Sequence, residues 1–486
     1  MAPQEYYDCI IVGGGIAGIN AAFRFQQAFP KLSYAILEGR DDIGGTWSLF
    51  QYPGIRSDSD LYTLSFPWDP WSEDESIAKG ESIMKYLRDI TKKHDLDNKI
   101  RLGHKVTSAN WDSSTQHWEL KVQVQGQEVS IVTKYLMMGT GYYDAEHPYQ
   151  AHIEGLSRFK GDVLHPQFWP QDYNYKGRRV VIIGSGATAI TMLPAMHQEV
   201  DHVTMLQRSP GYIISLPQTD WMRRVLRKTL PKSWAISLIR LHYILSAYLI
   251  FFFCKIFPIL SRRYIQYLAQ SQLPKEFSID PHFEPKYHPW DQRLCIAPDG
   301  DFYRCLSTGK ASIVTGEIST VTEDGVALTS GESFPADVIV TATGLRLKLL
   351  GHVHVTVDNG PPVTMGDYFT WRGCMLQNIP NLFALSGYFL ASYTLGIDNS
   401  CILIMRILAE AERQGNRVIT PTAKGTASIT PRAAVPLTSG YVQRGLKDKA
   451  TPKLGKSRPW SSEWFWFTDW FRSRFFQYTE GLTFEG

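Results

Sequence analysis

Two glycine-rich turns, each lying between an apolar strand and a helical pattern, constrain the fold of this chain more than any other feature. One turn follows CIIV and the other follows RRVVII. The motif positions are filled by Gly13, Gly15 and Gly18 in the first copy, and by Gly184, Gly186 and Ala189 in the second. This spacing permits a tight turn, close approach of backbone N–H groups to a pyrophosphate, and close packing of helix on strand. The chain therefore has the pattern of two dinucleotide-binding units in an α/β fold.

The residue that follows the second strand of each unit differs in charge between the two copies. Glu38 lies 20 residues after Gly18, and Arg208 lies 19 residues after Ala189. A carboxylate at this place accepts hydrogen bonds from a ribose diol, whereas a guanidinium pairs with a 2′-phosphate. We therefore predict that the first unit binds FAD and the second binds NADPH.

The positions of the motifs predict how the chain divides. We expect a flavoprotein with two Rossmann-like domains, in which the FAD domain is discontinuous. Residues 1–150 would form its first part, 151–340 the NADP domain, and 341–486 its second part with an aromatic tail. An apolar strand at Ala336–Gly344 would return the chain to the FAD domain, and a helical insertion is expected at about 212–290.

Composition excludes several other classes. The formal net charge is +3, and no basic run of the kind that binds nucleic acid occurs. The six cysteines are scattered without a CxxC pair, so neither a metal site nor a redox disulfide is expected. They favour a reducing compartment, which predicts a cytoplasmic protein. The first apolar run leads directly into glycines, so we expect no secretory signal.

The stretch FKGDVLHPQFWP, Phe159–Pro170, lies between the two units. Two prolines and a glycine predict irregular backbone through most of it. Its His165 is a candidate proton-transfer residue, but a hydrogen-bonding role at the joint between domains is the favoured interpretation.

This stretch resembles the F-x-G-x-x-x-H-x-x-x-W-P fingerprint of the Baeyer–Villiger monooxygenases. The matching residues are Phe159, Gly161, His165, Trp169 and Pro170. A second signature of that family, [A/G]-G-x-W-x-x-x-x-[F/Y]-P-[G/M]-x-x-x-D, is matched by GGTWSLFQYPGIRSD at Gly44–Asp58. Shorter segments such as IGSGATA, MLQRSP and HPWDQRL are similar to the ethionamide-activating subgroup. The resemblance spans roughly residues 8–445.

The resemblance implies a specific chemistry. NADPH reduces FAD, and the reduced flavin adds O₂ to give a C4a-peroxide while NADP⁺ stays bound. The peroxyflavin then attacks a ketone, which rearranges to an ester or lactone. The alternative is S- or N-oxygenation of a soft heteroatom by the same species. The expected substrate is a hydrophobic ketone or thioether, and the oligomeric state is left open.

The resemblance also assigns residues. Arg293 in HPWDQRLC would offset negative charge beside the flavin, and Asp58 would lie near the flavin and orient Arg293. Other FAD contacts are implied at Ala17, Gly45, Thr46, Trp47 and the backbone of Val106. NADP contacts are implied at Arg56, Ser57, Ser185, Thr188 and Ser209.

Plainer interpretations stand beside these. Arg293 taken alone is an ordinary ion-paired arginine, and Asp58 a turn residue. A disulfide reductase and a non-enzymatic nucleotide-binding protein are further alternatives. For the apolar run Leu241–Phe253 we expect a buried helix that lines the substrate pocket, because the run is short for a membrane span. Peripheral membrane contact is the alternative, favoured by the aromatic tail at 460–476.

Overall fold

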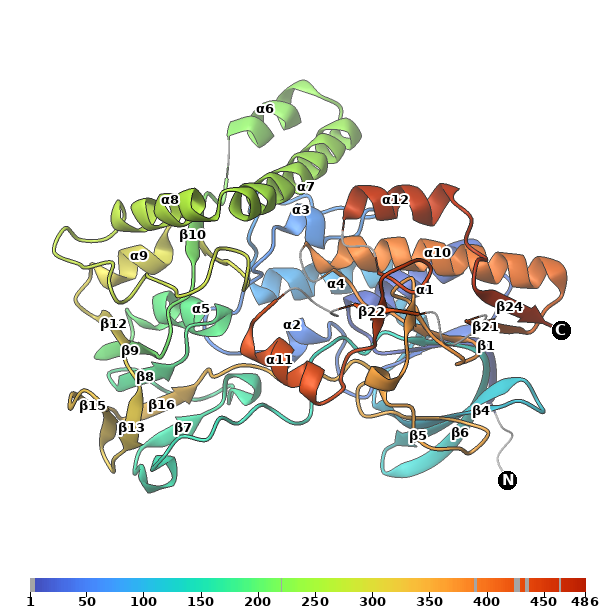
Figure 1. The fold of residues 1–486 in the computed structure, drawn as a ribbon, viewed down its shortest axis with the longest axis horizontal. Helices are drawn as coiled ribbons and strands as arrows, with labels where there is room; N and C mark the ends of the chain where they lie inside the picture. Colours follow the sequence, from blue (N-terminus) through green and yellow to red (C-terminus); the bar gives the residue numbers. More distant parts are fainter. Residues whose placement is uncertain (1–4, 220, 389–390, 424–428, 433–436, 463–464) are drawn as a thin grey trace.

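The computed structural model describes residues 5–219, 221–388, 391–423, 429–432, 437–462 and 465–486 (Figure 1). The predicted aromatic tail includes residues 463 and 464, which lie outside the described residues.

The larger sheet is built from the two ends of the chain. Its path is β17-β4-β5-β6-β1-β2-β3, and β20 also pairs with β6. The strands are β1 (Glu5–Val12), β2 (Tyr34–Leu37), β3 (Ile100–Arg101), β4 (His104–Asp112), β5 (His117–Val124), β6 (Gln127–Met138), β17 (His354–Val357), β18 (Thr370–Trp371), β19 (Met375–Leu376) and β20 (Leu382–Ala384). The last four residues of β1 are buried, as expected for a central parallel strand. Helices α1 (Ile16–Ala28) and α10 (Tyr393–Gln414) pack together and share one core cluster with this sheet.

The second sheet is entirely parallel. Its order is β12-β9-β8-β16-β7. The strands are β7 (Asp162–Leu164), β8 (Arg179–Ile183), β9 (His202–Gln207), β12 (Ala311–Thr315) and β16 (Val338–Thr341). Helices α5 (Ala187–Met196) and α9 (Asp301–Leu306) pack in its core. Each glycine turn therefore follows a buried strand and opens a helix.

The linker Phe159–Pro170 is more regular than its sequence predicts. Asp162–Leu164 pairs in parallel with β16, and a 3₁₀ turn, η3, follows at Pro166–Phe168. The strand ends before Pro166 because proline has no N–H to donate to a neighbouring strand.

The two sheets are joined by two crossovers that run side by side. Tyr143 and Leu347 form an antiparallel bridge. Asp144 N donates to Arg346 O at 2.9 Å, and Lys348 N donates to Tyr142 O at 3.0 Å. The outgoing and returning segments therefore hold each other.

The remaining elements surround these sheets. Helices are α2 (Thr46–Leu49), α3 (Leu61–Leu64), α4 (Gly80–Lys93), α6 (Trp221–Thr229), α7 (Lys232–Ile256), α8 (Pro258–Gln270), α11 (Gly440–Lys447) and α12 (Trp466–Phe475), with 3₁₀ turns η1 (Asp97–Lys99), η2 (Leu156–Arg158) and η4 (Met365–Asp367). Small sheets pair β10 (Ile213–Leu216) with β11 (Cys295–Pro298), β14 (Gly325–Leu328) with β13 (Ile318–Val321) and β15 (Ser333–Pro335), β21 (Val418–Pro421) with β24 (Leu482–Glu485), and β22 (Pro431–Arg432) with β23 (Leu454–Gly455).

The prediction of a buried helix at Leu241–Phe253 is wrong for most of that helix. α7 has 25 residues, and only 17% of its most apolar window is buried. In the part of the chain that the structure describes, it is the one helix long and apolar enough to cross a membrane by length and composition alone. Packing against the core therefore explains only part of the apolar composition of α7.

Candidate functional site

The first glycine turn forms a cradle that only glycine can build. Gly13 has φ +103°, and a Cβ there would lie 2.6 Å from Gly139 O. A Cβ on Gly18 would lie 1.9 Å from Gly13 O, so α1 approaches the end of β1 at backbone contact. Gly14 N donates to Glu38 Oε2 at 2.7 Å, which places the predicted ribose-binding carboxylate on the turn.

The segment that begins at Gly44 completes this cradle. Gly44 N donates to Gly14 O at 2.9 Å, and a Cβ on Gly15 would lie 3.3 Å from Gly45 Cα. No acidic residue lies in the first turn of α1, and its N-cap is Gly15. The positive end of the helix dipole is therefore available to a pyrophosphate, so the residues present fit the phosphates of FAD.

The remaining residues predicted to contact FAD lie on elements beside the cradle. Ala17 is buried on α1, whereas Thr46 and Trp47 start α2, with Thr46 exposed and Trp47 partly buried. Val106 is buried on β4, whose first residue, His104, donates its N–H to Glu38 O at 2.8 Å. The backbone near Val106 is thus adjacent to the strand end that carries Glu38.

The second glycine turn forms a more open cradle. Gly184 has φ +145°, and a Cβ there would lie 2.2 Å from Ala342 O, whereas a Cβ on Gly186 would meet no atom within 4 Å. Ser185 Oγ donates to Ser209 O at 2.8 Å. Arg208 is exposed and forms no hydrogen bond or ion pair with any residue that the structure describes. Its guanidinium is therefore available to a phosphate beside this turn.

The Gly44–Asp58 segment connects the two cradles. Tyr52 is buried and hydrogen-bonds Thr188, and burial raises the pKa of Tyr52 to about 12. Gly54 has φ +78°, and a Cβ there would lie 2.5 Å from Ala195 Cβ on α5. The segment therefore begins against the first glycine turn and packs on the helix of the second.

Two of the predicted NADP contacts within this segment already have protein partners. Arg56 forms an ion pair with Asp301 at the start of α9. Ser57 is buried, and its Oγ donates to Ser59 O at 2.6 Å. Their side chains stabilise the segment, and contact with a nucleotide stays a prediction for both.

Arg293 and Asp58 lie together, as the resemblance implies. Arg293 Nη1 is 3.7 Å from Asp58 Oδ2, and the side chains are 30% and 45% exposed. Burial alone would lower the pKa of Arg293, but negative charge on Tyr142 and Tyr441, which these phenols carry only at high pH, and on Asp58 outweighs it and raises that pKa. The guanidinium is therefore a permanent positive charge beside a carboxylate, with part of its surface accessible to a ligand.

Tyrosines around Arg293 were not found from the sequence. Tyr142 and Tyr143 come from the first crossover and Tyr441 from α11, and all three lie close enough to Arg293 to interact with it electrostatically. The ring of Tyr393, at the start of α10, has its centroid 5.4 Å from that of Tyr142. Burial raises the pKa values of Tyr143 and Tyr441, so their hydroxyls stay neutral and able to donate. The only sequence signal was the Tyr142–Tyr143 doublet, which no motif connects to Arg293.

His165 lies at the joint between the sheets. Its Nε2 is 3.2 Å from Tyr149 O, and its Nδ1 accepts a hydrogen bond from Gln167 N at 3.2 Å. Burial lowers the pKa of His165, which favours the neutral ring. Its hydrogen-bond partners among the residues that the structure describes do not include Arg293 or Asp58. This geometry fits the hydrogen-bonding interpretation better than proton transfer.

One cluster of potential metal ligands lies on the crossovers. Ligand atoms of Asp144, His147 and His352 lie within 4.8 Å of one another. Asp144 is buried, and its Oδ1 accepts from His352 Nε2 at 2.8 Å and from the N–H groups of Glu146 and His147. Burial opposes ionisation, but these hydrogen bonds outweigh it and lower the pKa of Asp144. The carboxylate is thus satisfied by the protein, and the predicted lack of a metal stays a prediction.

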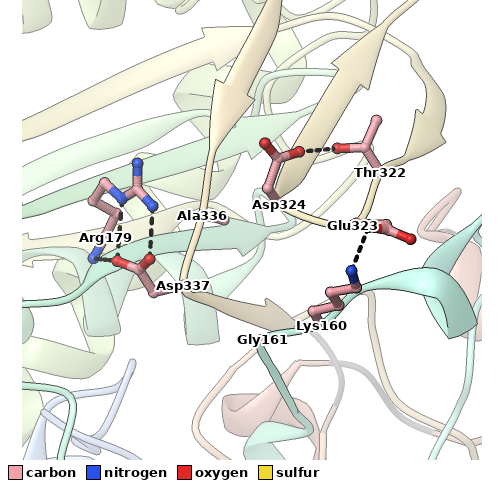
Figure 2. A pocket seen from close by; sticks show the side chains of 8 residues that line it. All are labelled: Lys160, Gly161, Arg179, Thr322, Glu323, Asp324, Ala336 and Asp337. Atoms are coloured by element: carbon pink, nitrogen blue, oxygen red, sulfur yellow. Dashed lines mark hydrogen bonds and ion pairs between the residues drawn. The ribbon is translucent and has the colours of Figure 1, made fainter.

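A surface pocket of about 700 Å³ lies elsewhere on the second sheet (Figure 2). Its charged groups pair with each other: Lys160 Nζ is 2.6 Å from Glu323 Oε2, and Arg179 Nη2 is 2.7 Å from Asp337 Oδ1. Arg179 begins β8, whereas Gly184 follows its other end. Ligands of such sheets bind at the carboxyl ends of strands, so this pocket lies at the wrong edge.

Comparisons with known proteins agree with this geometry. Residues 10–230 match the family model of pyridine nucleotide-disulphide oxidoreductases. The chain is 40% identical to the FAD-containing monooxygenase EthA of Mycolicibacterium smegmatis over 466 residues, covering 96% of this chain and 94% of the relative. It is 39% identical to a probable FAD-binding monooxygenase, AlmA, of Acinetobacter baylyi, covering 94% and 91%.

Solved structures show the same fold. An oxidised steroid monooxygenase bound to NADP superposes with a TM-score of 0.74 at 21% identity, covering 99% of this chain and 100% of the other. Cyclohexanone monooxygenase with bound ε-caprolactone superposes with a TM-score of 0.71 at 21% identity, covering 87% and 91%. The predicted fold, with its two dinucleotide-binding units, is confirmed.

Proposed function

The chain belongs to the FAD-containing monooxygenases, with FAD and NADP as cofactors, and from that premise we propose that it converts a hydrophobic ketone into an ester or lactone. The reaction consumes ketone, O₂, NADPH and a proton, and yields the ester, NADP⁺ and water. One oxygen atom enters the C–C bond beside the carbonyl, and the other leaves as water. The domain limits 1–150, 151–340 and 341–486 belong to the same proposal.

The observation that carries this proposal is the ion pair of Arg293 and Asp58 at the end of the segment that connects the cradles. Bound FAD supplies the electrons that activate O₂. Arg293 offsets the negative charge that develops on oxygen, because a fixed cation in a partly dry site stabilises such charge strongly. Asp58 orients the guanidinium, and the neutral hydroxyls of Tyr143 and Tyr441 lie near it.

The other residues position the cofactors. The glycine turns and helix ends hold the two pyrophosphates, Glu38 accepts from the ribose of FAD, and Arg208 pairs with the 2′-phosphate of NADPH. His165 holds the joint between the domains. These roles are supported by the hydrogen bonds, glycine contacts and exposure described above.

A product assay tests the proposal. Purified FAD-loaded protein is given NADPH, O₂ and, in parallel, an apolar linear ketone or a matched thioether. We expect ester from the ketone with equimolar NADPH consumption. Sulfoxide from the thioether without ester from the ketone would instead assign heteroatom oxygenation. NADPH oxidation that yields only hydrogen peroxide with both substrate classes would refute the proposal.

A further inference from the structure

Large apolar side chains lie in solvent along one rim of the molecule, where α6, α7, α8 and α12 run (Figure 1). On α7 they recur every three or four residues over the whole helix, and their exposed fractions run from 38% to 68%. We call them the outer stripe: Trp234, Leu238, Leu241, Leu245, Leu249, Phe252 and Ile256. This spacing places them on one helical face.

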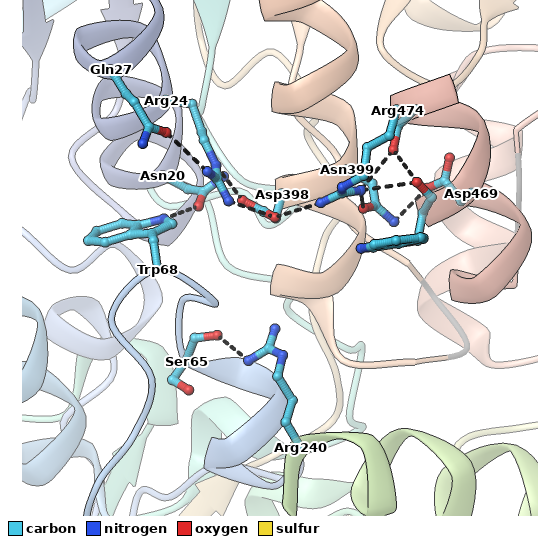
Figure 3. Close-up of polar contacts among 12 residues, drawn as sticks. Asn20, Arg24, Gln27, Ser65, Trp68, Arg240, Asp398, Asn399, Asp469 and Arg474 are labelled. Carbon is cyan, nitrogen blue, oxygen red and sulfur yellow. Dashed lines mark hydrogen bonds and ion pairs between the residues drawn. The ribbon is translucent and has the colours of Figure 1, made fainter. Parts of the chain in front are cut away.

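The rest of the α7 surface is also largely apolar, and part of it is held by the core. Its buried residues are Ala235, Ile239, Ile244, Tyr248 and Cys254. Arg240 also points inward, where its Nη1 donates to Tyr62 O at 2.7 Å and, as Figure 3 shows, to Ser65 O at 3.0 Å. Because contacts with the fold run along its length, α7 lies on the protein surface and does not cross a bilayer.

The outer stripe continues onto its neighbours. Phe257, Ile259 and Leu260 are 53%, 63% and 57% exposed where α7 turns into α8. Toward α12, the ring of Phe465, which caps the start of that helix, stacks on Phe252, with centroids 5.7 Å apart and planes at 8°. The outer stripe, these residues and the exposed Phe467, Trp470, Phe471 and Phe475 of α12 together form what we call the apolar face.

α12 reverses the ordinary pattern of a surface helix. Arg474 Nη1 donates to Asn399 Oδ1 at 2.8 Å, and Arg474 Nη2 is 3.7 Å from Asp398 Oδ2 on α10 (Figure 3). Asp469 accepts a hydrogen bond from the buried Tyr388. Its polar groups therefore contact the protein while its aromatic rings face solvent. Such an arrangement is typical of a surface with an apolar partner.

Charge identifies the partner. Residues 221–275 contain ten Lys and Arg and no Asp or Glu, although the whole chain carries only +3, so the rest carries −7. Arg224, Lys228, Lys232 and Arg263 are exposed, and none of them forms an ion pair with a residue that the structure describes. Interspersed cations and aromatic rings on an apolar helical surface match an anionic lipid layer.

We propose that the apolar face docks on the surface of an anionic lipid bilayer, with its rings in the headgroup layer and these four cations against lipid phosphates. A second copy of the chain fits less well, because a two-fold contact would bring the basic surface against itself. Lys255 Nζ is 2.9 Å from Asp291 Oδ1, and the Phe251 ring lies 5.5 Å from Trp290. Docking therefore places α7 between the lipid surface and the loop that carries Arg293.

Vesicle flotation of the FAD-loaded protein, without NADPH or substrate, tests the docking separately from the proposed reaction. Vesicles contain phosphatidylcholine alone or phosphatidylcholine and phosphatidylglycerol in equal parts. We expect the protein to float with the mixed vesicles and to be released by high salt. The variant with Trp234→Gln, Leu245→Gln and Leu249→Gln should lose at least about tenfold in binding, because each buried CH₂ contributes appreciably.

The matched control changes Leu102→Gln, in the turn between β3 and β4, and Val129→Gln, on β6. They are 42% and 40% exposed, and this variant should bind as the original chain does. Changing the four free cations to Gln should weaken binding to mixed vesicles by about fivefold per charge. The proposal is overturned if the original chain floats with neither vesicle, or if the stripe variant binds as well as the control. A dimer that the stripe variant abolishes, without vesicle binding, would assign the face to a second copy.

Discussion

Replacing Arg293 with alanine separates its effect on stability from its effect on oxygen insertion. At 3.7 Å, a unit charge pair is worth about 1 kcal/mol in water and about 4 kcal/mol at an effective dielectric of ~20. Asp58 is 45% exposed, so water screens the pair and solvates the carboxylate left behind. We therefore expect Arg293→Ala to lose about 1 kcal/mol of stability and to retain FAD.

The same change should affect ester formation far more. Loss of a fixed donor to developing negative charge lowers turnover by about 10²–10³-fold. Anaerobic reduction of the bound flavin by NADPH should stay close to normal, because the guanidinium is not needed to stabilise charge in that step. In air, NADPH oxidation should continue but yield hydrogen peroxide instead of ester. Arg293→Lys keeps the charge but lacks the planar guanidinium, so its rate of ester formation should lie between those of the original chain and Arg293→Ala.

A matched ion pair supplies the control. Arg88 Nη2 is 2.6 Å from Asp42 Oδ2, and the two side chains are 54% and 44% exposed. This pair lies outside the site. Stopped-flow absorbance measures flavin reduction, and chromatography measures ester against peroxide. Ester formation by Arg293→Ala at the original coupling, or an equal loss in Arg88→Ala, would refute the role of Arg293.

The remaining predictions concern the cofactors and the crossovers. Arg208→Ala should narrow the preference for NADPH over NADH in kcat/KM by about 10- to 100-fold, since a charge-assisted hydrogen bond is lost; an unchanged ratio would contradict the assignment. Gly18→Ala should purify without FAD, because its Cβ would lie 1.9 Å from Gly13 O, whereas Gly186→Ala, with open space around its Cβ, should keep FAD and raise the KM for NADPH. Absorbance of bound flavin distinguishes these two variants. Asp144→Asn should lower the free energy of unfolding at pH 7 by about 1–3 kcal/mol. Because the folded-state pKa of Asp144 lies below 3.8, this loss of unfolding free energy should be complete above about pH 4 and shrink as the pH falls further. Denaturant titration across that pH range measures it. A loss that does not change with pH would exclude the charge of Asp144 as its cause.

The sequence was sufficient for features that depend on local spacing. Gly13, Gly18 and Gly184 each face a backbone oxygen at a distance that only glycine allows. The glycine motif in the sequence therefore follows directly from the backbone geometry of the turn. Arg293 and Asp58 could be connected only through the resemblance, because 235 residues separate them in the chain.

The tyrosines near Arg293 show what local patterns cannot predict. Tyr142, Tyr393 and Tyr441 come from a crossover and two helices that meet only in the folded chain. The outer stripe of α7 was missed for another reason: a helix that is apolar all round reads as buried, and sequence alone does not say which face is covered. The strand at Asp162–Leu164 was missed because tertiary pairing with β16 overrides its weak local pattern.

The paired crossovers restrict how the halves of the molecule can move. Tyr143 and Leu347 are bridged where the polypeptide passes from one sheet to the other and back, so both passages share a single axis. Pulling the halves apart would break the bond from Asp144 N to Arg346 O, whereas swivelling about that axis would preserve it. The close approach of Gly54 to Ala195 and the ion pair of Arg56 with Asp301 also join the halves, so a swivel about the crossovers would have to break or rearrange these contacts.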